Sequence, residues 1–286
     1  MRAVHTLADR YPQMRVLITG ATSGLGEALA LLFAAGGFRV AVASRNPTKV
    51  EATCARVTAA GGEALPLTLD VTRVEDFEAA ATAVREAWGG LDILVNNAGI
   101  LTSGKVLDTG MAEWQQSLDT DLWGVIQGCR ILLPLLVEAG GGHVANIASA
   151  AGLLGGPDIA SYGVAKAGVV SLSESMAVEL AEQNIDVTVS CPTVFRSSLL
   201  DAQGHDTALM TGVTAEGLKH DMETTSVGSD DVAEHLLRSM VRRRLYSVPQ
   251  WDARAQWWLC RTFPETFRRF ILYLYRHRLW VFNNDA

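Results

Sequence analysis

One stretch near the start of the chain, residues 14–35, constrains the fold more than any other. Residues 14–19 are a short apolar run typical of a buried strand, and residues 27–35 have a helical pattern. Between them lies a glycine-rich turn, Gly-Ala-Thr-Ser-Gly-Leu-Gly, from Gly20 to Gly26. Glycines let the backbone approach a pyrophosphate, and a helix N-terminus offers it free N–H groups. The three pieces therefore predict a nucleotide-binding turn, with an ordinary tight turn as the alternative.

Strand and helix patterns of similar length alternate along the rest of the chain. Further strands are expected at residues 38–43, 63–69, 91–95, 143–148, 185–190 and 245–248. Helices are expected at residues 48–60, 73–88, 111–138, 160–183 and 229–243. Pro134 should kink or shorten the helix that contains it. The alternation predicts an α/β fold, a doubly wound parallel sheet with helices on both faces. We expect one domain at residues 14–249, an N-terminal extension at 1–13 and a helical extension at 250–286.

Composition excludes several classes of function. The chain has 286 residues, of which 49% are hydrophobic, so it can bury a large core. Its net charge of -7 argues against nucleic acid as a partner, because phosphate binding needs a basic surface. The 4 cysteines form no CxxC pair and the 6 histidines have no ligand spacing, so no metal is predicted. Residues 1–13 are too polar for a signal peptide, and no apolar run approaches the ~20 residues of a membrane span. These features predict a cytoplasmic protein.

The residues after the second strand bear on the choice of cofactor. Ser44, Arg45 and Asn46 lie where a dinucleotide fold contacts the adenosine ribose. An acidic residue there would select NAD, whereas Ser44 does not repel a 2′-phosphate and the Arg45 guanidinium can bind one. The sequence thus favours NADP. The alternatives are NAD, with Ser44 bonded to the ribose, and a purely solvated Arg45.

Tyr162 and Lys166 are four residues apart in a helical segment and therefore share one face of the helix. The ammonium favours the phenolate, so we expect the pKa of Tyr162 to fall toward neutrality and the phenol to exchange a proton with a substrate oxygen. A chance pair in a helix is the alternative. Ser149 follows the strand at residues 143–148, and the start of the next helix can bring it close to Tyr162.

Together these pieces resemble the short-chain dehydrogenase/reductase family, over about residues 15–249. The matching residues, in the right order and at the right spacing, are Thr19 to Gly26, Asp70, Asn96 to Gly99, Ser149, Tyr162 and Lys166. The resemblance implies a Rossmann-type sheet of seven strands and a nicotinamide cofactor. It also implies an oxidoreductase that interconverts a secondary alcohol and a ketone or aldehyde.

The resemblance assigns roles to these residues. Tyr162 would be the general acid in reduction or the base in oxidation, Lys166 would lower its pKa and bind the nicotinamide ribose, and Ser149 would hold the substrate oxygen. Asp70 would contact the adenine, and Asn97 the region of the adenine ribose. The full set of expected cofactor contacts is Gly20, Thr22, Ser23, Gly24, Leu25, Gly26, Ser44, Arg45, Asn46, Asp70, Val71, Asn97, Ala98, Gly99, Tyr162, Lys166, Pro192, Thr193, Val194 and Ser197.

Two positions depart from the family pattern. Asp121 stands where the family usually has an asparagine that serves a water-linked proton relay. Our hypothesis is that Asp121, a fourth catalytic residue, still accepts from that water, with an altered pH dependence. The competing interpretation is an impaired site in a nucleotide-binding regulatory or scaffold protein. Thr193 follows Pro192 where the family often has glycine, and Ser197 replaces its usual threonine.

The substrate end is less defined by sequence. In the family, residues 196–227 would form a lid, and an apolar alcohol or ketone could lie against Leu153, Leu154, Phe195, Leu199 and Met210; ordinary packing is the alternative. Residues 251–286 are rich in aromatic residues and arginine. They could form a wall of the substrate pocket, a subunit interface or a contact with a membrane surface. Because dimers and tetramers are common in the family, we expect a homo-oligomer.

Overall fold

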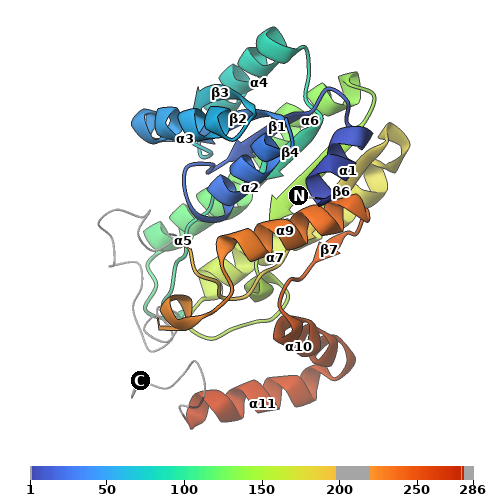
Figure 1. Cartoon of the computed structure of the whole chain (residues 1–286). Coiled ribbons are helices and arrows are strands. Elements are labelled where there is room, and N and C mark those ends of the chain that lie inside the picture. The colour runs from blue at the N-terminus through green and yellow to red at the C-terminus, as the bar shows by residue number, and fades with distance from the viewer. Residues whose placement is uncertain (1, 198–219, 278, 280–286) are drawn as a thin grey trace.

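The computed structural model describes residues 2–197, 220–277 and 279. A sheet of seven strands, all of them parallel, forms its centre, in the order β3-β2-β1-β4-β5-β6-β7 (Figure 1). The strands are β1 (Arg15–Thr19), β2 (Arg39–Ser44), β3 (Glu63–Thr68), β4 (Ile93–Asn96), β5 (Gly142–Ile147), β6 (Ile185–Ser190) and β7 (Tyr246–Ser247). The chain leaves the sheet's centre in one direction after β1 and in the other after β4. The predicted Rossmann-type doubly wound fold is confirmed.

Helices cover both faces of the sheet because successive side chains of each strand point to opposite sides. In β1, Leu17 belongs to one hydrophobic core, and Val16 and Ile18 belong to the other. The first core is covered by α4 (Val74–Trp88), α6 (Gly124–Glu138) and α7 (Ala160–Glu179). The second is covered by α1 (Arg2–Arg10), α2 (Gly24–Ala35), α3 (Pro47–Ala59) and α9 (Ser229–Val241).

A π-helical turn, Asp119–Trp123, joins α5 (Met111–Leu118) to α6. The continuous run Met111–Glu138 is long and apolar enough to cross a membrane by length and composition, but much of it is buried in the core. Of the two expected effects of Pro134, a kink or a shortened helix, the shortening is wrong, since α6 continues to Glu138. Pro134 and Arg130 are exposed, so the carbonyl group that loses its helical bond lies close to water.

The N-terminal residues pack onto the body of the protein. Val4 and Leu7 of α1 are fully buried. The Arg10 guanidinium donates to the carbonyl oxygens of Met240 and Val241 in α9, at 3.2 and 2.9 Å. A Cβ atom on Gly36 would lie 2.5 Å from a methyl carbon of Val4, so this glycine lets α1 approach α2 closely. Helix α1 is therefore part of the second core.

The chain continues after β7 into two helices, α10 (Trp251–Thr262) and α11 (Pro264–Arg276), which lie together at one end of the molecule (Figure 1, bottom). Pro264 occupies the first turn of α11, where its missing N–H is no loss. Trp257 packs on Tyr246, with ring centroids 4.7 Å apart, and Arg261 pairs with Glu174 at 3.6 Å. The predicted C-terminal helical extension is thus present and attached to the sheet.

Burial of α1 leads to a prediction about stability. Leu7→Ala should lower the free energy of unfolding by about 2–5 kcal/mol, because it removes a fully buried side chain and leaves a cavity. Chemical denaturation monitored by circular dichroism measures this change. Leu107→Ala is the matched control, since Leu107 is 96% exposed and its loss should change stability by less than about 0.5 kcal/mol. Equal stability of the two variants would show that α1 is not part of the cooperative unit.

Candidate active site

A cavity of about 720 Å³ follows the edge of the sheet where the parallel strands end. Its walls include residues just after β1, β2, β3, β4, β5 and β6, because parallel strands place all their carboxyl ends at one edge. The glycine-rich turn lies at one end of the cavity, and helix α11 lines the other. Each predicted cofactor contact lines it except Gly26.

The glycine-rich turn has the geometry that the sequence predicts. Gly20 and Gly24 have φ angles of 63° and 52°, a left-handed conformation that glycine adopts without strain. Ser23 precedes α2 but its side chain makes no capping bond, so the first amides of this helix have no side-chain partner. These amides border the cavity and fit the phosphates of a dinucleotide. Gly26 has a packing role, because a Cβ atom there would lie 2.2 Å from the Gly20 carbonyl oxygen.

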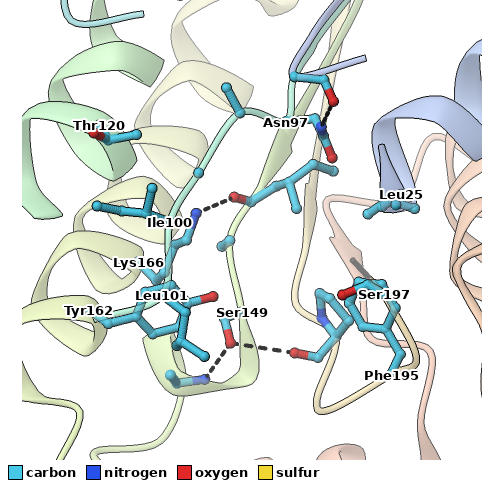
Figure 2. Close-up of a pocket in the computed structure, with 18 of the residues that line it drawn as sticks. Leu25, Asn97, Ile100, Leu101, Thr120, Ser149, Tyr162, Lys166, Phe195 and Ser197 are labelled. Atoms are coloured by element: carbon cyan, nitrogen blue, oxygen red, sulfur yellow. Dashed lines mark hydrogen bonds between the residues drawn. The ribbon is translucent and has the colours of Figure 1, made fainter. Parts of the chain in front are cut away.

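Hydrogen bonds fix the ends of β1 and β4 to each other. The Thr19 hydroxyl accepts from the backbone N–H groups of Asn97 and Ala98, at 2.9 and 3.0 Å. The Asn97 side-chain amide donates to the carbonyl oxygens of Thr19 and Gly20, at 2.9 and 3.1 Å. Figure 2 shows Asn97 in this position, above the cavity. The amide group of Asn97 thus holds the glycine turn, and its expected contact with a ribose remains a prediction.

The end of the cavity near β2 is lined by polar and basic residues. Ser44 is half-buried and its hydroxyl accepts from the Thr22 hydroxyl at 3.0 Å, whereas Arg45 and Asn46 are exposed at the rim. The Asn46 side chain caps α3 by accepting from the N–H of Lys49 at 3.0 Å. Lys49 also lines this rim and is a second cation that the sequence analysis missed. The sequence could have indicated Lys49, because this residue lies in the first turn of the helix that follows β2.

Ser149, Tyr162 and Lys166 come together on one side of the cavity (Figure 2). The Ser149 hydroxyl accepts from the N–H of Ala151 at 3.1 Å and donates to the carbonyl oxygen of Pro192 at 3.5 Å. Lys166 Nζ lies 5.6 Å from the centroid of the Tyr162 ring and donates to the carbonyl oxygen of Ile147 at 3.1 Å. A hydroxyl, a phenol and an ammonium therefore face one point at the ends of β5 and α7.

The expectation that the pKa of Tyr162 falls toward neutrality is wrong for the protein alone. Burial raises the pKa of Tyr162 and is the largest influence on it. Lys166 and the hydrogen bond from Ser149 act in the expected direction and lower it, while Asp121 raises it. The net shift is upward, because a phenolate at this position would lose most of its contact with water.

Asp121 lies behind Lys166, in the π-helical turn, and is completely buried. Its Oδ1 atom is 3.2 Å from Lys166 Nζ and accepts from the N–H of Ile100 at 3.0 Å. Burial raises the pKa of Asp121 in spite of the nearby ammonium. Burial alone would lower the pKa of Lys166, but Asp121 and Tyr162 together raise it. Gly99 leaves room for this pair, since a Cβ atom there would lie 2.6 Å from Asp121 Oδ1.

The far wall of the cavity is largely apolar. Leu154 and Phe195 line it as expected, while Leu153 packs against the core instead. The predicted pocket residues Leu199 and Met210, and most of the expected lid, lie outside the described residues. Helices α10 and α11 contribute Gln256, Phe267 and Ile271 to the lining, as expected if residues 251–286 form a wall of the pocket; Gln256 and Ile271 were not singled out from the sequence. In the sequence, the four-residue spacing of Phe267 and Ile271 indicates that both lie on one face of a helix.

The loop after β6 is held from the start of α10. Pro192, Thr193, Val194 and Ser197 line the cavity. The Gln250 side chain accepts from the N–H of Thr193 at 3.1 Å and donates to the carbonyl oxygen of Val194 at 3.3 Å. In the described ranges, no three His, Cys, Asp or Glu side chains are grouped to hold a metal ion.

Comparison with known proteins decides the family. The family model described as short chain dehydrogenase matches residues 14–208. The chain belongs to the short-chain dehydrogenase/reductase family. Members of this family are oxidoreductases that bind NAD or NADP.

Two relatives and one solved structure illustrate the likeness of this dehydrogenase/reductase to known proteins. It is 31% identical over 258 residues to the "Probable oxidoreductase EphD" of Mycobacterium tuberculosis, covering 88% of this chain but only 44% of that relative's length. It is 34% identical over 187 residues to the 3-oxoacyl-(acyl-carrier-protein) reductase FabG of Staphylococcus aureus, with 65% of this chain and 76% of FabG covered. A Burkholderia phymatum short-chain dehydrogenase/reductase in complex with NAD matches with a TM-score of 0.81 and 27% identity, covering 88% and 94% of the two chains.

The buried pair of Asp121 and Lys166 predicts a change in pH dependence. Because the charge of Asp121 raises the pKa of Tyr162, Asp121→Asn should lower that pKa. Alcohol oxidation needs the deprotonated tyrosine, so its rate rises with pH through this pKa, and in the variant the rise should move to lower pH. The pH profile of kcat/KM for oxidation measures the shift.

Asp119→Asn is the matched control for this experiment. Asp119 lies in the same π-helical turn, but its carboxylate accepts from the Gln115 side chain at 2.7 Å. Its replacement should leave the profile unchanged. An unchanged profile for Asp121→Asn as well would contradict an electrostatic role for Asp121.

Proposed function

We propose that the protein is an NADP-preferring dehydrogenase/reductase that interconverts a secondary alcohol and a ketone or aldehyde on an apolar substrate. The observation that carries this proposal is the convergence of Ser149, Tyr162 and Lys166 beside a cavity with an apolar far wall. When bound, the nicotinamide cofactor supplies or accepts the hydride. The protein's own residues then have to place the substrate and move one proton.

The three polar residues divide this work among them. In reduction, the Tyr162 hydroxyl gives its proton to the carbonyl oxygen of the substrate, and in oxidation the phenolate takes it back. The raised pKa keeps the phenol protonated at neutral pH, which is the form that reduction requires. The Ser149 hydroxyl donates to the substrate oxygen and stabilises its developing charge. The ammonium of Lys166 stabilises the phenolate that remains, and Asp121 moderates that effect through its ion pair with Lys166.

The proposed preference for NADP rests on the residues that follow β2 and line the rim of the cavity. Residues Ser44 to Asn46 include no acid that would repel a 2′-phosphate, and Arg45 and Lys49 supply two cations there. NAD is the alternative, and it is the cofactor bound by the related Burkholderia phymatum protein.

We further propose that the protein acts in the cytoplasm as a homo-oligomer, a dimer or a tetramer, with a small apolar alcohol or ketone as its substrate and no nucleic acid as a partner. Apolar side chains exposed away from the cavity support self-association. Trp123, beside α6, and Val178 in α7 are 51% and 77% exposed.

The test of the proposed reaction is Tyr162→Phe. This variant should lose activity by about 10²–10⁴-fold, the usual contribution of a general acid, while NADPH binding is kept. Turnover of a panel of apolar ketones and the corresponding alcohols, together with fluorescence titration of NADPH, measures both effects. Tyr11→Phe is the control, because Tyr11 is buried beside α1 and its hydroxyl donates to the Gly142 carbonyl oxygen at 3.3 Å.

Two outcomes of this experiment would count against the proposal. Full activity in Tyr162→Phe would refute the proton transfer. Cofactor binding without turnover, in both the native protein and Asp121→Asn, would favour a nucleotide-binding regulatory or scaffold protein.

The cofactor preference is tested by Arg45→Ala. The change should weaken NADPH binding by about tenfold or more, because it removes charge-assisted hydrogen bonds to the 2′-phosphate, and should leave NADH binding nearly unchanged. Arg39→Ala is the matched control, since Arg39 lies at the opposite end of the same strand, β2. Equal losses for NADPH and NADH, or a native protein that prefers NADH, would overturn the preference.

A further inference from the structure

The outer face of the α10–α11 pair carries exposed aromatic side chains. Trp251 and Trp258 are seven residues apart, share one face of α10, and are 76% and 61% exposed. Phe263, Phe270 and Tyr273 are more than half exposed along α11 and the turn before it. Trp258 meets Phe263 edge-on, with ring centroids 6.2 Å apart, so the two helices present one continuous aromatic surface. We call these five residues the aromatic surface.

The same helices face the cavity on their inner side. Phe267 and Ile271 line the cavity, and Leu274, seven residues after Phe267, is buried. Figure 1 shows α10 and α11 at the lower end of the molecule, with the sheet and its flanking helices above them. The pair is therefore a wall whose inner face lines the apolar cavity, while the five residues of the aromatic surface are exposed to solvent.

Charge on this wall is opposite to the charge of the whole protein. Within Trp251–Arg276 there are five arginines and two acids, whereas the chain has a net charge of -7. Arg261 pairs with Glu174 and Arg268 with Glu265, at 3.6 and 3.1 Å.

Two further arginines remain available on α11. Arg269 and Arg276 are exposed, and neither makes an ion pair with any residue that the structure describes. They share one helical face with Tyr273, at spacings of four and three residues. Two cations without an ion pair among the described residues thus border the aromatic surface.

We propose that the aromatic surface docks on an anionic lipid bilayer. Tryptophan, tyrosine and phenylalanine side chains suit the boundary between headgroups and acyl chains, and arginines beside them bind phosphate groups of the lipid. The acidic remainder of the protein is repelled by the same surface, so docking is expected only through this end. The docking goes beyond the proposed reaction, because it needs neither cofactor nor turnover.

Charge favours a bilayer over a second copy of the chain. In a symmetric dimer formed through the aromatic surface, the same patch lies on both partners, so two patches that each carry Arg269 and Arg276 would meet and their positive charges would repel. An anionic bilayer pairs with them instead. The wall geometry adds a reason for docking, because among the described residues the α10–α11 pair separates the cavity from the surface at this end of the molecule.

Vesicle flotation tests this proposal with the native chain of 286 residues. The probes are vesicles of phosphatidylcholine alone and vesicles that contain about one-third phosphatidylglycerol. Binding to the anionic vesicles should be at least about tenfold tighter and should weaken as salt is raised, since ions screen the attraction. Equal binding to both vesicles, or binding to neither, would overturn the proposal.

Substitutions in α10 and α11 test which residues contact the vesicle. Replacing both cations, by R269Q with R276Q, should weaken binding to anionic vesicles by roughly tenfold or more, at about fivefold for each arginine. Trp258→Ser and Phe270→Ser should each weaken it severalfold. The matched controls are R73Q with R238Q, whose side chains are 63% and 56% exposed, just before α4 and in α9, and Leu107→Ser, at a position that is 96% exposed. Equal losses in the variants and their controls would contradict docking through this face.

Two further measurements separate docking on a bilayer from misfolding of a variant and from self-association. Thermal unfolding and NADPH titration of each variant establish that it folds, and the salt dependence of the native protein needs no variant. Light scattering gives the oligomeric state. A dimer that fails to bind vesicles and dissociates on Trp258→Ser would assign the aromatic surface to self-association and overturn the proposal. Vesicle binding by a protein without turnover would leave the docking intact while the proposed reaction fails.

Discussion

The site depends on the close approach of the ends of β1 and β4, where the chain reverses direction across the sheet. The Asn97 amide reaches the carbonyl oxygens of Thr19 and Gly20, and the Thr19 hydroxyl binds the backbone of Asn97 and Ala98. Gly26 has no room for a side chain against Gly20. These contacts fix the glycine turn, and the turn in turn aims the uncapped start of α2 at the cavity. Glycine is therefore required at position 26 for packing, independently of any role in binding a ligand.

A second constraint is the placement of charge where little water reaches. Lys166 and Asp121 are both buried and lie 3.2 Å apart, with Gly99 leaving space beside them. Breaking such a pair by removing one partner commonly destabilises a protein by about 3–5 kcal/mol, because the other charge is left buried. An asparagine at position 121 keeps the shape but removes the charge that offsets the ammonium. The aspartate at position 121 thus opposes, through its charge, the effect by which Lys166 lowers the pKa of Tyr162.

Sequence reasoning predicted those features that depend on short spacings and on the topology of the sheet. Tyr162 and Lys166 meet because they are four residues apart on a helix, and Ser149 joins them because β5 ends beside α7. The direction of the pKa shift at Tyr162 was not predictable, since it depends on how much water the whole fold excludes.

A pocket wall from the C-terminal extension was one of three possibilities that the sequence left open, whereas the docking of α1 on α9 was beyond prediction. Both are contacts between segments far apart in the chain, and no local pattern encodes which surface a terminal helix will find. That Pro134 does not shorten its helix was not predictable for a related reason, since the cost of the lost bond depends on access of water to Arg130.

The attachment of α10 and α11 has a consequence for motion. This pair is joined to the rest of the protein through side-chain contacts such as Trp257 on Tyr246 and the Tyr275 hydroxyl to Asp158, at 3.3 Å, and no strand of the sheet passes through it. Elements held in this way open at a small fraction of the global free energy of unfolding. Backbone amides of α11 should then exchange with solvent deuterium well before those of β1 and β4. The rate of that opening would set an upper limit on how fast a substrate enters and a product leaves past the wall.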